Sequence, residues 1–325
     1  MKITVLDGFA VNPGDLSWDF LSKYGEAAVY DKTPPELAAE RCADAEAVFT
    51  NRTEITEELL CKCPKIRYVS ALGTGYDMID LAACKRHGVE VCNVPGYSSD
   101  SVAQFAFALL LNLVTDIKGF TEIVKMGKWT GVPNFHYENV RFIELSGKTL
   151  GIIGFGAIGK RVGAMAQAFG MNVIATTRTR TSGSDNGVTF LPLDELLGKS
   201  DVVSLHCPLN EGTRGMVDKA FIGRMKDGAF LINTARGAIL NEQDVADALN
   251  SGKLAGAGLD VLAAEPARPD NPLLKAKNCI ITPHAAWTSV AARKRLLKIL
   301  EENLESFVRT GKGINRVVLE VRGKG

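Results

Sequence analysis

The sequence has no excess of charge of either sign. Its 325 residues include 38 Lys and Arg and 37 Asp and Glu, which gives a formal net charge of +1. Proteins that bind nucleic acids or membrane surfaces through charge usually have a strong basic excess. We therefore expect neither a nucleic acid nor a membrane among the partners of this chain.

Long hydrophobic runs are absent as well. The apolar stretch at residues 101–114 (SVAQFAFALLLNLV) is shorter than the roughly 20 residues that a membrane-spanning helix needs. It follows a Ser-Ser-Asp cluster at 98–100 that suits a helix N-cap, so it predicts a buried helix. The first residues, MKITVLDGF, have the pattern of a strand rather than of a signal peptide.

The seven cysteines show no pattern that indicates disulfides or a metal. No two form a C-x-x-C pair, and Cys61 and Cys63 are too close together for a zinc knuckle. The four histidines have no ligand spacing with acids or cysteines. An odd number of cysteines without a framework is typical of a reducing compartment. These features predict a cytoplasmic protein without a metal site.

Short β-branched strands alternate with helical segments along two parts of the chain. Such alternation predicts an α/β fold with two doubly wound parallel sheets. The first series fills residues 1–100, and the second runs from about Lys148 to Trp287. A closing helix is expected from Thr288 to about Arg309. We expect Leu297, Leu300, Leu304, Phe307 and Val308 on its apolar face, with Arg293, Lys294, Lys298, Glu301, Glu302 and Glu305 on the other. The layout predicts residues 101–287 as one domain inserted into a second, made of 1–100 and 288–325.

A glycine-rich turn follows the first strand of the second series. The residues are Gly154, Phe155, Gly156, Ala157, Ile158 and Gly159, a G-x-G-x-x-G pattern between a strand and a helix. In that context the pattern indicates dinucleotide binding, because the glycines admit a tight turn, a close pyrophosphate and close helix packing. The N–H groups at the start of the helix then face the phosphates.

The next strand ends without the acidic residue that usually binds the ribose of NAD. No Asp or Glu lies between Gly159 and Asp185, and Thr177 occupies the expected position. An acid there would repel a 2′-phosphate, whereas Arg178 and Arg180 can pair with one. The stretch predicts a preference for NADP, with weaker use of NAD as the alternative.

Three ionisable residues follow later strands of the same series. Arg236 follows GAFLINT, Glu265 lies beyond LAGAGLD, and His284 follows NCIIT. Ligands of open α/β sheets bind at the carboxyl ends of the strands. Together the three supply a cation, a proton donor and an orienting carboxylate, the set that hydride transfer to a carbonyl acid needs.

These segments resemble the D-isomer-specific 2-hydroxyacid dehydrogenase family over nearly the whole chain. The similarity is carried by the glycine turn and by HCPLNEGTRGMV (206–217), LINTARGAILNEQDVADAL (231–249), GAGLDVLAAEP (256–266) and ITPHAAW (281–287). NVPGYSSDSVAQ (93–104) and the Trp of PHAAW are most similar to the glycerate dehydrogenase and hydroxypyruvate reductase branch. The resemblance implies a Rossmann dinucleotide-binding domain inserted into a flavodoxin-like substrate domain.

The resemblance also implies roles for individual residues. Arg236 binds the carboxylate and carbonyl oxygen of a 2-oxo acid, His284 donates the proton, and Glu265 orients the imidazole and favours its protonated form. Substrate contacts are further implied for Gly73, Thr74, Gly75, Arg52 and Trp287. Cofactor contacts are implied for Ser101, Gly154, Gly156, Ala157, Ile158, Gly159, Thr177, Arg178, Arg180, His206, Cys207, Pro208, Thr213, Thr234, Ala235, Asp260, His284 and Ala286.

The activity that this resemblance implies is NADP(H)-preferring reduction of hydroxypyruvate, and of glyoxylate, to D-glycerate and glycolate. A D-lactate dehydrogenase is the alternative within the family, as is a 3-phosphoglycerate dehydrogenase, which would need extra cationic groups. A dinucleotide-sensing corepressor is an alternative outside enzymes, since such proteins also keep the Arg, Glu and His. The apolar helix from Ser101 and the aromatic segment at 127–144 favour a homodimer.

Overall fold

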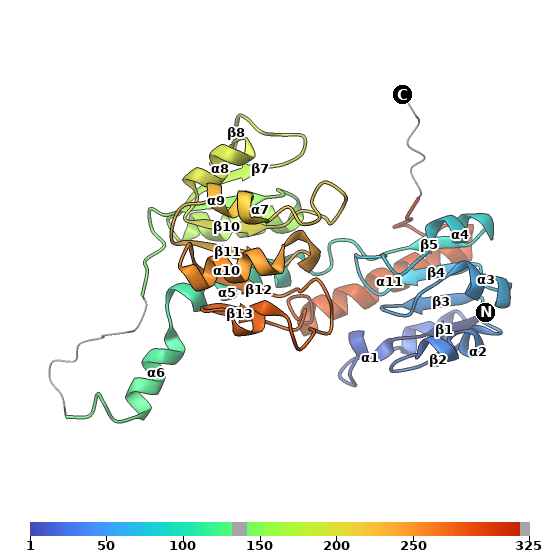
Figure 1. Ribbon diagram of the computed structural model, residues 1–325. Coiled ribbons are helices and arrows are strands. Elements are labelled where there is room, and N and C mark those ends of the chain that lie inside the picture. Colours follow the sequence, from blue (N-terminus) through green and yellow to red (C-terminus); the bar gives the residue numbers. More distant parts are fainter. Residues whose placement is uncertain (132–141, 319–325) are drawn as a thin grey trace. The chain divides into compact units, whose positions relative to one another are not determined.

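The computed structural model describes residues 1–131 and 142–318 of the chain. The chain divides into two compact units, which are described separately below (Figure 1). Unit 1 comprises Met1–Ser98 and Thr288–Gly325, and unit 2 comprises Ser99–Trp287. The α/β fold with parallel sheets is confirmed.

Unit 1 is built on a five-stranded parallel sheet in the order β2-β1-β3-β4-β5, which is the flavodoxin order. The strands are β1 (Lys2–Val5), β2 (Glu26–Val29), β3 (Ala47–Thr50), β4 (Tyr68–Ala71) and β5 (Glu90–Cys92). The helices are α1 (Gly8–Val11), α2 (Ala38–Cys42), α3 (Glu57–Lys62), α4 (Leu81–Arg86) and α11 (Val290–Thr310), with short 3-10 turns at Asp19–Lys23 and Pro35–Leu37. The central strands β3 and β4 are buried at every position, as expected for a parallel sheet covered on both faces.

The closing helix α11 is confirmed, but its buried face differs from the predicted one. Arg293, expected among the exposed charges, is only 6% exposed, whereas Val308, expected on the apolar face, is 50% exposed. The guanidinium of Arg293 forms two 2.6 Å hydrogen bonds to Asp15 and also donates to the carbonyl of Val11. A buried charge is tolerated when it is paired in this way, and periodicity alone does not reveal the partner.

Unit 2 is built on an eight-stranded sheet in the order β13-β12-β11-β10-β6-β7-β9-β8. The strands are β6 (Thr149–Ile153), β7 (Asn172–Thr176), β8 (Ser184–Asp185), β9 (Val188–Phe190), β10 (Val202–Leu205), β11 (Ala229–Asn233), β12 (Leu254–Leu259) and β13 (Cys279–Ile281). All pairings are parallel except that of β8 with β9. The order reverses between β6 and β10, the switch point at which such sheets bind ligands.

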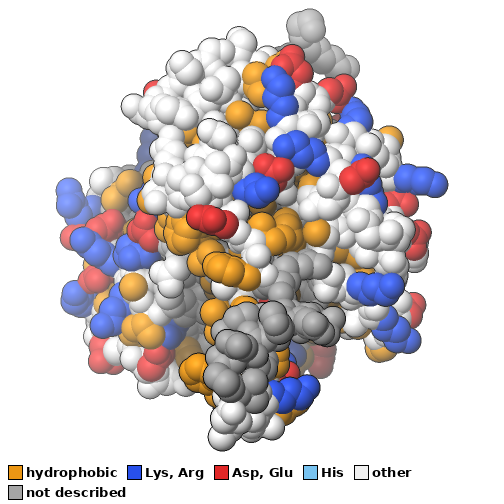
Figure 2. All heavy atoms as spheres, turned by 90° about the vertical axis from the view of Figure 1, so that its left-hand side faces the viewer, with side chains coloured by type: hydrophobic (Ala, Val, Ile, Leu, Met, Phe, Trp, Pro, Cys, Tyr) orange, Lys and Arg blue, Asp and Glu red, His pale blue; other side chains and the backbone are white. Residues whose placement is uncertain are grey.

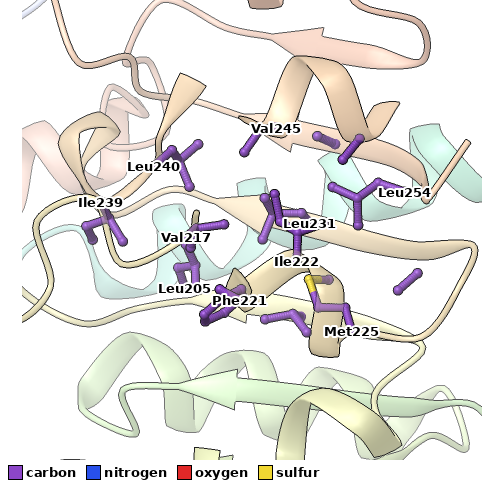
Figure 3. Close-up of a cluster of buried hydrophobic side chains, with 14 of the residues drawn as sticks. Leu205, Val217, Phe221, Ile222, Met225, Leu231, Ile239, Leu240, Val245 and Leu254 are labelled. Carbon is purple, nitrogen blue, oxygen red and sulfur yellow. The ribbon is translucent and has the colours of Figure 1, made fainter. Parts of the chain in front are cut away.

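The helices of unit 2, except the one at Ile117–Lys125, cover both faces of this sheet. They are α5 (Ser99–Val114), α6 (Ile117–Lys125), α7 (Ala157–Ala168), α8 (Leu193–Lys199), α9 (Lys219–Arg224) and α10 (Glu242–Ser251), with 3-10 turns at Gly237–Ile239 and Pro272–Lys275. On one face, side chains of β10, β11 and β12 pack against α9 and α10 in a cluster that includes Leu205, Phe221, Leu231, Val245 and Leu254 (Figure 3). This core fixes the strand ends that carry the predicted site residues.

Helix α5 confirms the buried helix expected at residues 101–114. Nine of its 16 residues are buried, and it packs against α7, β11 and β12. Among the described residues, none of the helices combines the length and the hydrophobicity of a membrane span. The next helix, α6, was not predicted, and none of its residues is buried. Most of the aromatic segment at 127–144 lies outside the described residues.

Candidate functional site

The glycine turn is shaped by steric requirements at two of its three glycines. Gly154 has φ +95°, and a Cβ there would lie 2.6 Å from the backbone N of Cys207. A Cβ on Gly159 would lie 2.3 Å from the carbonyl oxygen of Gly154. The first glycine therefore lets the turn pass beside the loop after β10, and the third lets α7 pack against β6.

The second glycine of the turn, Gly156, has no such requirement. Its φ of −82° and ψ of −157° are open to any residue, and no described atom lies within 4 Å of an added Cβ. Packing therefore does not explain why this exposed position lacks a side chain. The residues fit a dinucleotide here, because the second glycine of the fingerprint is the one that a pyrophosphate approaches.

The loop after β10 lies beside the glycine turn, because β10 is next to β6 in the sheet. The N–H of His206 donates to the carbonyl of Ile153 at 2.8 Å, which continues the pairing of β10 with β6. Burial lowers the pKa of His206 to about 4, so this imidazole is neutral at pH 7 and its Nε2 lies 2.8 Å from Ser204 Oγ. Thr213 closes the loop by donating to the carbonyl of Pro208 at 2.7 Å. His206, Cys207, Pro208 and Thr213, four of the predicted cofactor contacts, thus lie in one loop beside the glycine turn.

The segment after β7 forms a compact turn over Thr177–Arg180. The Thr177 hydroxyl accepts the N–H of Arg180 at 2.9 Å, and the Thr177 N–H donates to the Arg180 carbonyl at 3.0 Å. The two arginines differ. Arg180 lies 3.9 Å over the ring of Phe190 and 3.4 Å from Asp185, whereas Arg178 is exposed and pairs with no described carboxylate. Arg178 is therefore better placed than Arg180 to bind the 2′-phosphate of a dinucleotide.

The loop after β11 holds Arg236 through the buried side chain of Asn233. Asn233 Nδ2 donates to the Arg236 carbonyl at 2.9 Å, and Asn233 Oδ1 accepts the N–H of Ala235 at 3.0 Å. The Arg236 guanidinium donates to the Ala235 carbonyl at 2.8 Å. The hydroxyl of Thr234 is buried and has no partner among the described residues. A buried hydroxyl without a partner is costly, which is consistent with a ligand that completes this loop.

The loop after β13 holds His284 through the carboxylate of Asp260, which is 1% exposed. That carboxylate accepts the N–H groups of Ala285 and Ala286 at 2.8 and 2.9 Å and the hydroxyl of Thr282 at 2.6 Å. His284 itself has φ +54°, a left-handed conformation uncommon outside glycine. The structure thus gives Asp260 a positioning role, because it fixes the backbone that presents the imidazole.

His284 and Glu265, two of the candidate catalytic residues, lie within hydrogen-bond distance of each other. The Nδ1 of His284 lies 2.8 Å from Glu265 Oε2, with both side chains about one-third exposed. The other carboxylate oxygen accepts the N–H of Leu262 at 3.3 Å, which fixes the orientation of Glu265. A carboxylate on Nδ1 holds the imidazole in one orientation.

Arg236, Glu265 and His284 lie at the same edge of the sheet. Asn233, Leu259 and Ile281 end the neighbouring strands β11, β12 and β13 in matching register. Gly237 tightens this arrangement, since a Cβ there would lie 1.9 Å from the carbonyl carbon of Leu262. The loop that bears Arg236 is therefore packed directly on the loop that leads to Glu265.

The N-terminus of α5 is tied to the His284 loop. Ser101 Oγ donates to the carbonyl of Ala286 at 2.6 Å, which joins two predicted cofactor contacts. Trp287 is half-buried and follows His284 by three residues. The glycine turn, the Thr177 turn and these loops are all carried by unit 2.

The predicted substrate turn, Gly73-Thr74-Gly75, follows β4 in unit 1. The Thr74 hydroxyl donates to the Val94 carbonyl at 2.8 Å, and Asn93 donates to the Thr74 carbonyl at 2.8 Å. These bonds fix the turn, while its three backbone N–H groups have no acceptor among the described residues. Free N–H groups in a fixed turn are suited to a carboxylate.

Arg52 lies on the same unit, in a loop that Asp7 organises. The Asp7 carboxylate accepts the N–H groups of Asn51, Arg52 and Thr53, each at 2.9 Å. Burial acts to raise the pKa of Asp7, but these hydrogen bonds outweigh it, so the pKa is below its usual value. The Arg52 side chain is exposed and borders a surface hollow of about 650 Å³.

The residues that brace these loops were not predicted from the sequence. Asp7 lies two residues beyond β1 and Asn233 ends β11, and both bind backbone N–H groups. A buried polar residue at the end of an apolar strand was the available signal, because such a group needs a partner. It could not have identified which backbone groups were bound.

The chain is similar in sequence to a known protein family. Residues 107–286 match the model of the D-isomer specific 2-hydroxyacid dehydrogenase, NAD binding domain. The chain belongs to this family. It is 47% identical over 321 residues to a hydroxypyruvate reductase of Blautia hydrogenotrophica, covering 98% of this chain and 99% of that protein. It is 36% identical over 318 residues to a glyoxylate reductase of Aeropyrum pernix, covering 94% and 95%.

The fold has a matching solved structure. An acyclic imino acid reductase in complex with NADPH and D-Arg aligns with a TM-score of 0.85 and 33% identity, covering 98% of this chain and 100% of that one. The chain is therefore an oxidoreductase, a D-2-hydroxyacid dehydrogenase with a Rossmann domain for NAD or NADP. The family resemblance and the enzyme class inferred from the sequence are confirmed.

Proposed function

We propose that this dehydrogenase reduces hydroxypyruvate, and glyoxylate with it, to D-glycerate and glycolate, with NADPH as the preferred reductant. The observation that carries the chemistry is the His284–Glu265 pair, at 2.8 Å, on the strand edge that also bears Arg236. The substrate is supported by the 47% identity to a hydroxypyruvate reductase. The seven free cysteines are consistent with a reducing cytoplasm.

Each of the three residues has a defined task in this proposal. Bound nicotinamide would supply the hydride. Arg236 binds the carboxylate and carbonyl oxygen of the 2-oxo acid through its planar donors. His284 transfers the proton on Nε2 to the carbonyl oxygen, and Glu265 stabilises the imidazolium through Nδ1. Unit 2 is the dinucleotide-binding domain and unit 1 the substrate domain, whose Gly73–Gly75 N–H groups are available for a carboxylate.

The cofactor preference rests on the Thr177–Arg180 turn. Thr177 has no charge to repel a 2′-phosphate, and the exposed Arg178 can pair with one. The Arg180 side chain holds the turn in place through its contacts with Phe190 and Asp185. Its charge also adds to the positive potential at the turn. The NADPH complex of the imino acid reductase shows that a related fold accepts this cofactor.

Initial rates of hydroxypyruvate reduction, with NADPH and NADH each varied through saturation, test both parts of the proposal. We expect kcat/KM to favour NADPH, and Arg178→Ala to reduce that advantage about 10–100-fold, the value of a charge-assisted phosphate pair of roughly 1.5–3 kcal/mol. The kcat/KM for NADH should change little, because NADH lacks the phosphate.

Arg214→Ala, which removes an exposed arginine outside this turn, serves as the control and should leave the ratio unchanged. An NADH advantage in the wild type would refute the cofactor assignment alone. Turnover of pyruvate but not hydroxypyruvate would indicate a D-lactate enzyme. Absence of turnover with all 2-oxo acids, together with tight NADPH binding, would favour a dinucleotide-sensing role.

We further propose that the protein is a homodimer formed through α6. Ile117 and Val124, two turns apart on α6, and Met126 and Trp129, just beyond its end, are 49–67% exposed, although all four are large apolar residues. Hydrophobic side chains are exposed on the face shown in Figure 2, which is the side of Figure 1 where α6 projects. Apolar patches of this kind are typical of association surfaces.

Light scattering coupled to gel filtration is expected to give twice the chain mass of 35.0 kDa. Ile117→Glu with Val124→Glu should shift the mass to that of one chain, because charges would be buried without partners. Glu122→Lys alters the polar side of the same helix and should leave the mass unchanged. A wild-type protein of one chain mass at micromolar concentration would refute the dimer.

A further inference from the structure

Three different metal-binding side chains meet on unit 1, apart from every residue assigned above. Glu57 and Cys61 lie one turn apart on α3, so they share one face of that helix. His87 is the C-cap residue of α4, which packs against α3. The carboxylate, thiol and imidazole atoms of these residues all lie within 4.8 Å of one another.

The separations are close to those around a tetrahedral ion. Cys61 Sγ lies 3.9 Å from His87 Nε2 and 3.9 Å from Glu57 Oε1. Ligand bonds of about 2.0–2.3 Å to zinc place ligand atoms about 3.3–3.8 Å apart. The remaining distance, 2.7 Å between Glu57 Oε1 and His87 Nε2, is that of a hydrogen bond, which an ion would replace with a slightly wider separation.

The contacts converge on one nitrogen, which distinguishes this cluster from a catalytic relay. In a Cys-His-Glu relay the thiol and the carboxylate use opposite nitrogens of the ring. Here the thiol and the carboxylate both face Nε2 of His87. Three donor atoms that face one another around a common point are the arrangement that a single cation requires.

Arg86 fixes the carboxylate of this cluster. Its guanidinium donates to Oε2 of Glu57, through Nε at 3.0 Å and also through Nη2. The second oxygen, Oε1, is thereby directed at Cys61 and His87 as a monodentate donor. Residues that orient ligands from outside in this way are typical of metal sites.

We propose that Glu57, Cys61 and His87 bind one zinc ion, with water as the fourth ligand, and that this ion fastens α3 to α4. Thiolate and imidazole together select zinc over the hard cations magnesium and calcium. No metal site was predicted from the sequence, in which Cys61 and His87 are 26 positions apart. The folded chain brings the three together.

Zinc binding to metal-free, untagged protein is the direct test, measured by competition with a chromophoric chelator. We expect one equivalent of zinc per chain. Cys61→Ser and His87→Asn should each weaken binding at least tenfold, since each removes a ligand. Glu58→Gln, which removes the adjacent carboxylate of α3 that pairs with Lys62, should stay within twofold of the wild type.

Cobalt and thiol labelling give two independent readouts. Cobalt in place of zinc should produce a thiolate charge-transfer band in the near ultraviolet and visible bands of tetrahedral cobalt, both lost in Cys61→Ser. Cys61 is the exposed cysteine of the seven, so zinc should slow its alkylation by N-ethylmaleimide at least tenfold. Circular dichroism and the rate of 2-oxo acid reduction should be unchanged in the variants, because these surface residues take no part in the reaction.

Failure of the wild type to bind zinc, or equal binding by wild type and Cys61→Ser, would overturn the proposal. Zinc that binds but leaves Cys61 fully reactive would also overturn it, since the ion would then be elsewhere.

Discussion

Replacing His284 with Gln is expected to lower kcat for hydroxypyruvate reduction about 10³-fold, within the range attributed to a general acid. Gln keeps a hydrogen-bonding side chain but cannot deliver a proton. NADPH binding should weaken far less than kcat falls, because the imidazole acts mainly on the substrate oxygen. Stopped-flow absorbance at the NADPH band measures the chemical step, and cofactor fluorescence measures the binding.

Glu265→Gln provides the matched comparison, because Glu265 acts through His284 rather than on the substrate. Its carboxylate lies 2.8 Å from His284 Nδ1 and holds the imidazole in one orientation. Glu265→Gln should therefore lower kcat less than His284→Gln does, because the imidazole that donates the proton is retained and only its orientation is weakened. A His284→Gln enzyme with more than a tenth of wild-type kcat would refute the assignment of the acid.

The sequence predicted the fold because the relevant signals are local. Parallel strands buried on both faces appear as short apolar runs, and β3, β4, β10 and β11 were found in this way. The glycine pattern and the residues at strand ends identified Arg236, Glu265 and His284 as candidates for one edge of the sheet. The Glu265–His284 pair and the shared strand register bring the three to that edge.

What the sequence could not predict depends on contacts between distant segments. Arg293 has the position of a surface charge in the helical pattern, but its partner Asp15 is 278 residues away. The bracing roles of Asp7 and Asp260 likewise arise only when neighbouring strand ends are brought together. The Glu57, Cys61 and His87 cluster joins α3 to the end of α4, and its histidine is 26 positions from its cysteine. In each case the hydrophobic periodicity of the sequence predicts the helix or strand, but it does not predict which distant residue the side chain contacts.

The glycine turn allows the requirements of the fold to be separated from those of the ligand. Gly159→Val would place a branched side chain against the carbonyl of Gly154, where even a Cβ is 2.3 Å away. We expect it to destabilise unit 2 by at least about 1–3 kcal/mol, the usual cost of overpacking, or to prevent folding. Thermal unfolding followed by circular dichroism measures this effect.

Gly156→Val should weaken cofactor binding and leave the stability of the fold nearly unchanged. Its backbone is extended, and no described atom lies within 4 Å of an added Cβ, so the melting temperature should stay within a few degrees of the wild type. NADPH binding, measured by fluorescence titration, should weaken at least 100-fold, because the side chain would occupy the path of the pyrophosphate. The ratio of NADPH to NADH affinity should be preserved, since the ribose turn at Thr177 is untouched. Wild-type NADPH affinity in Gly156→Val would mean that the pyrophosphate does not pass this glycine. The open position at the start of α7 would then have no explanation in the binding of a dinucleotide.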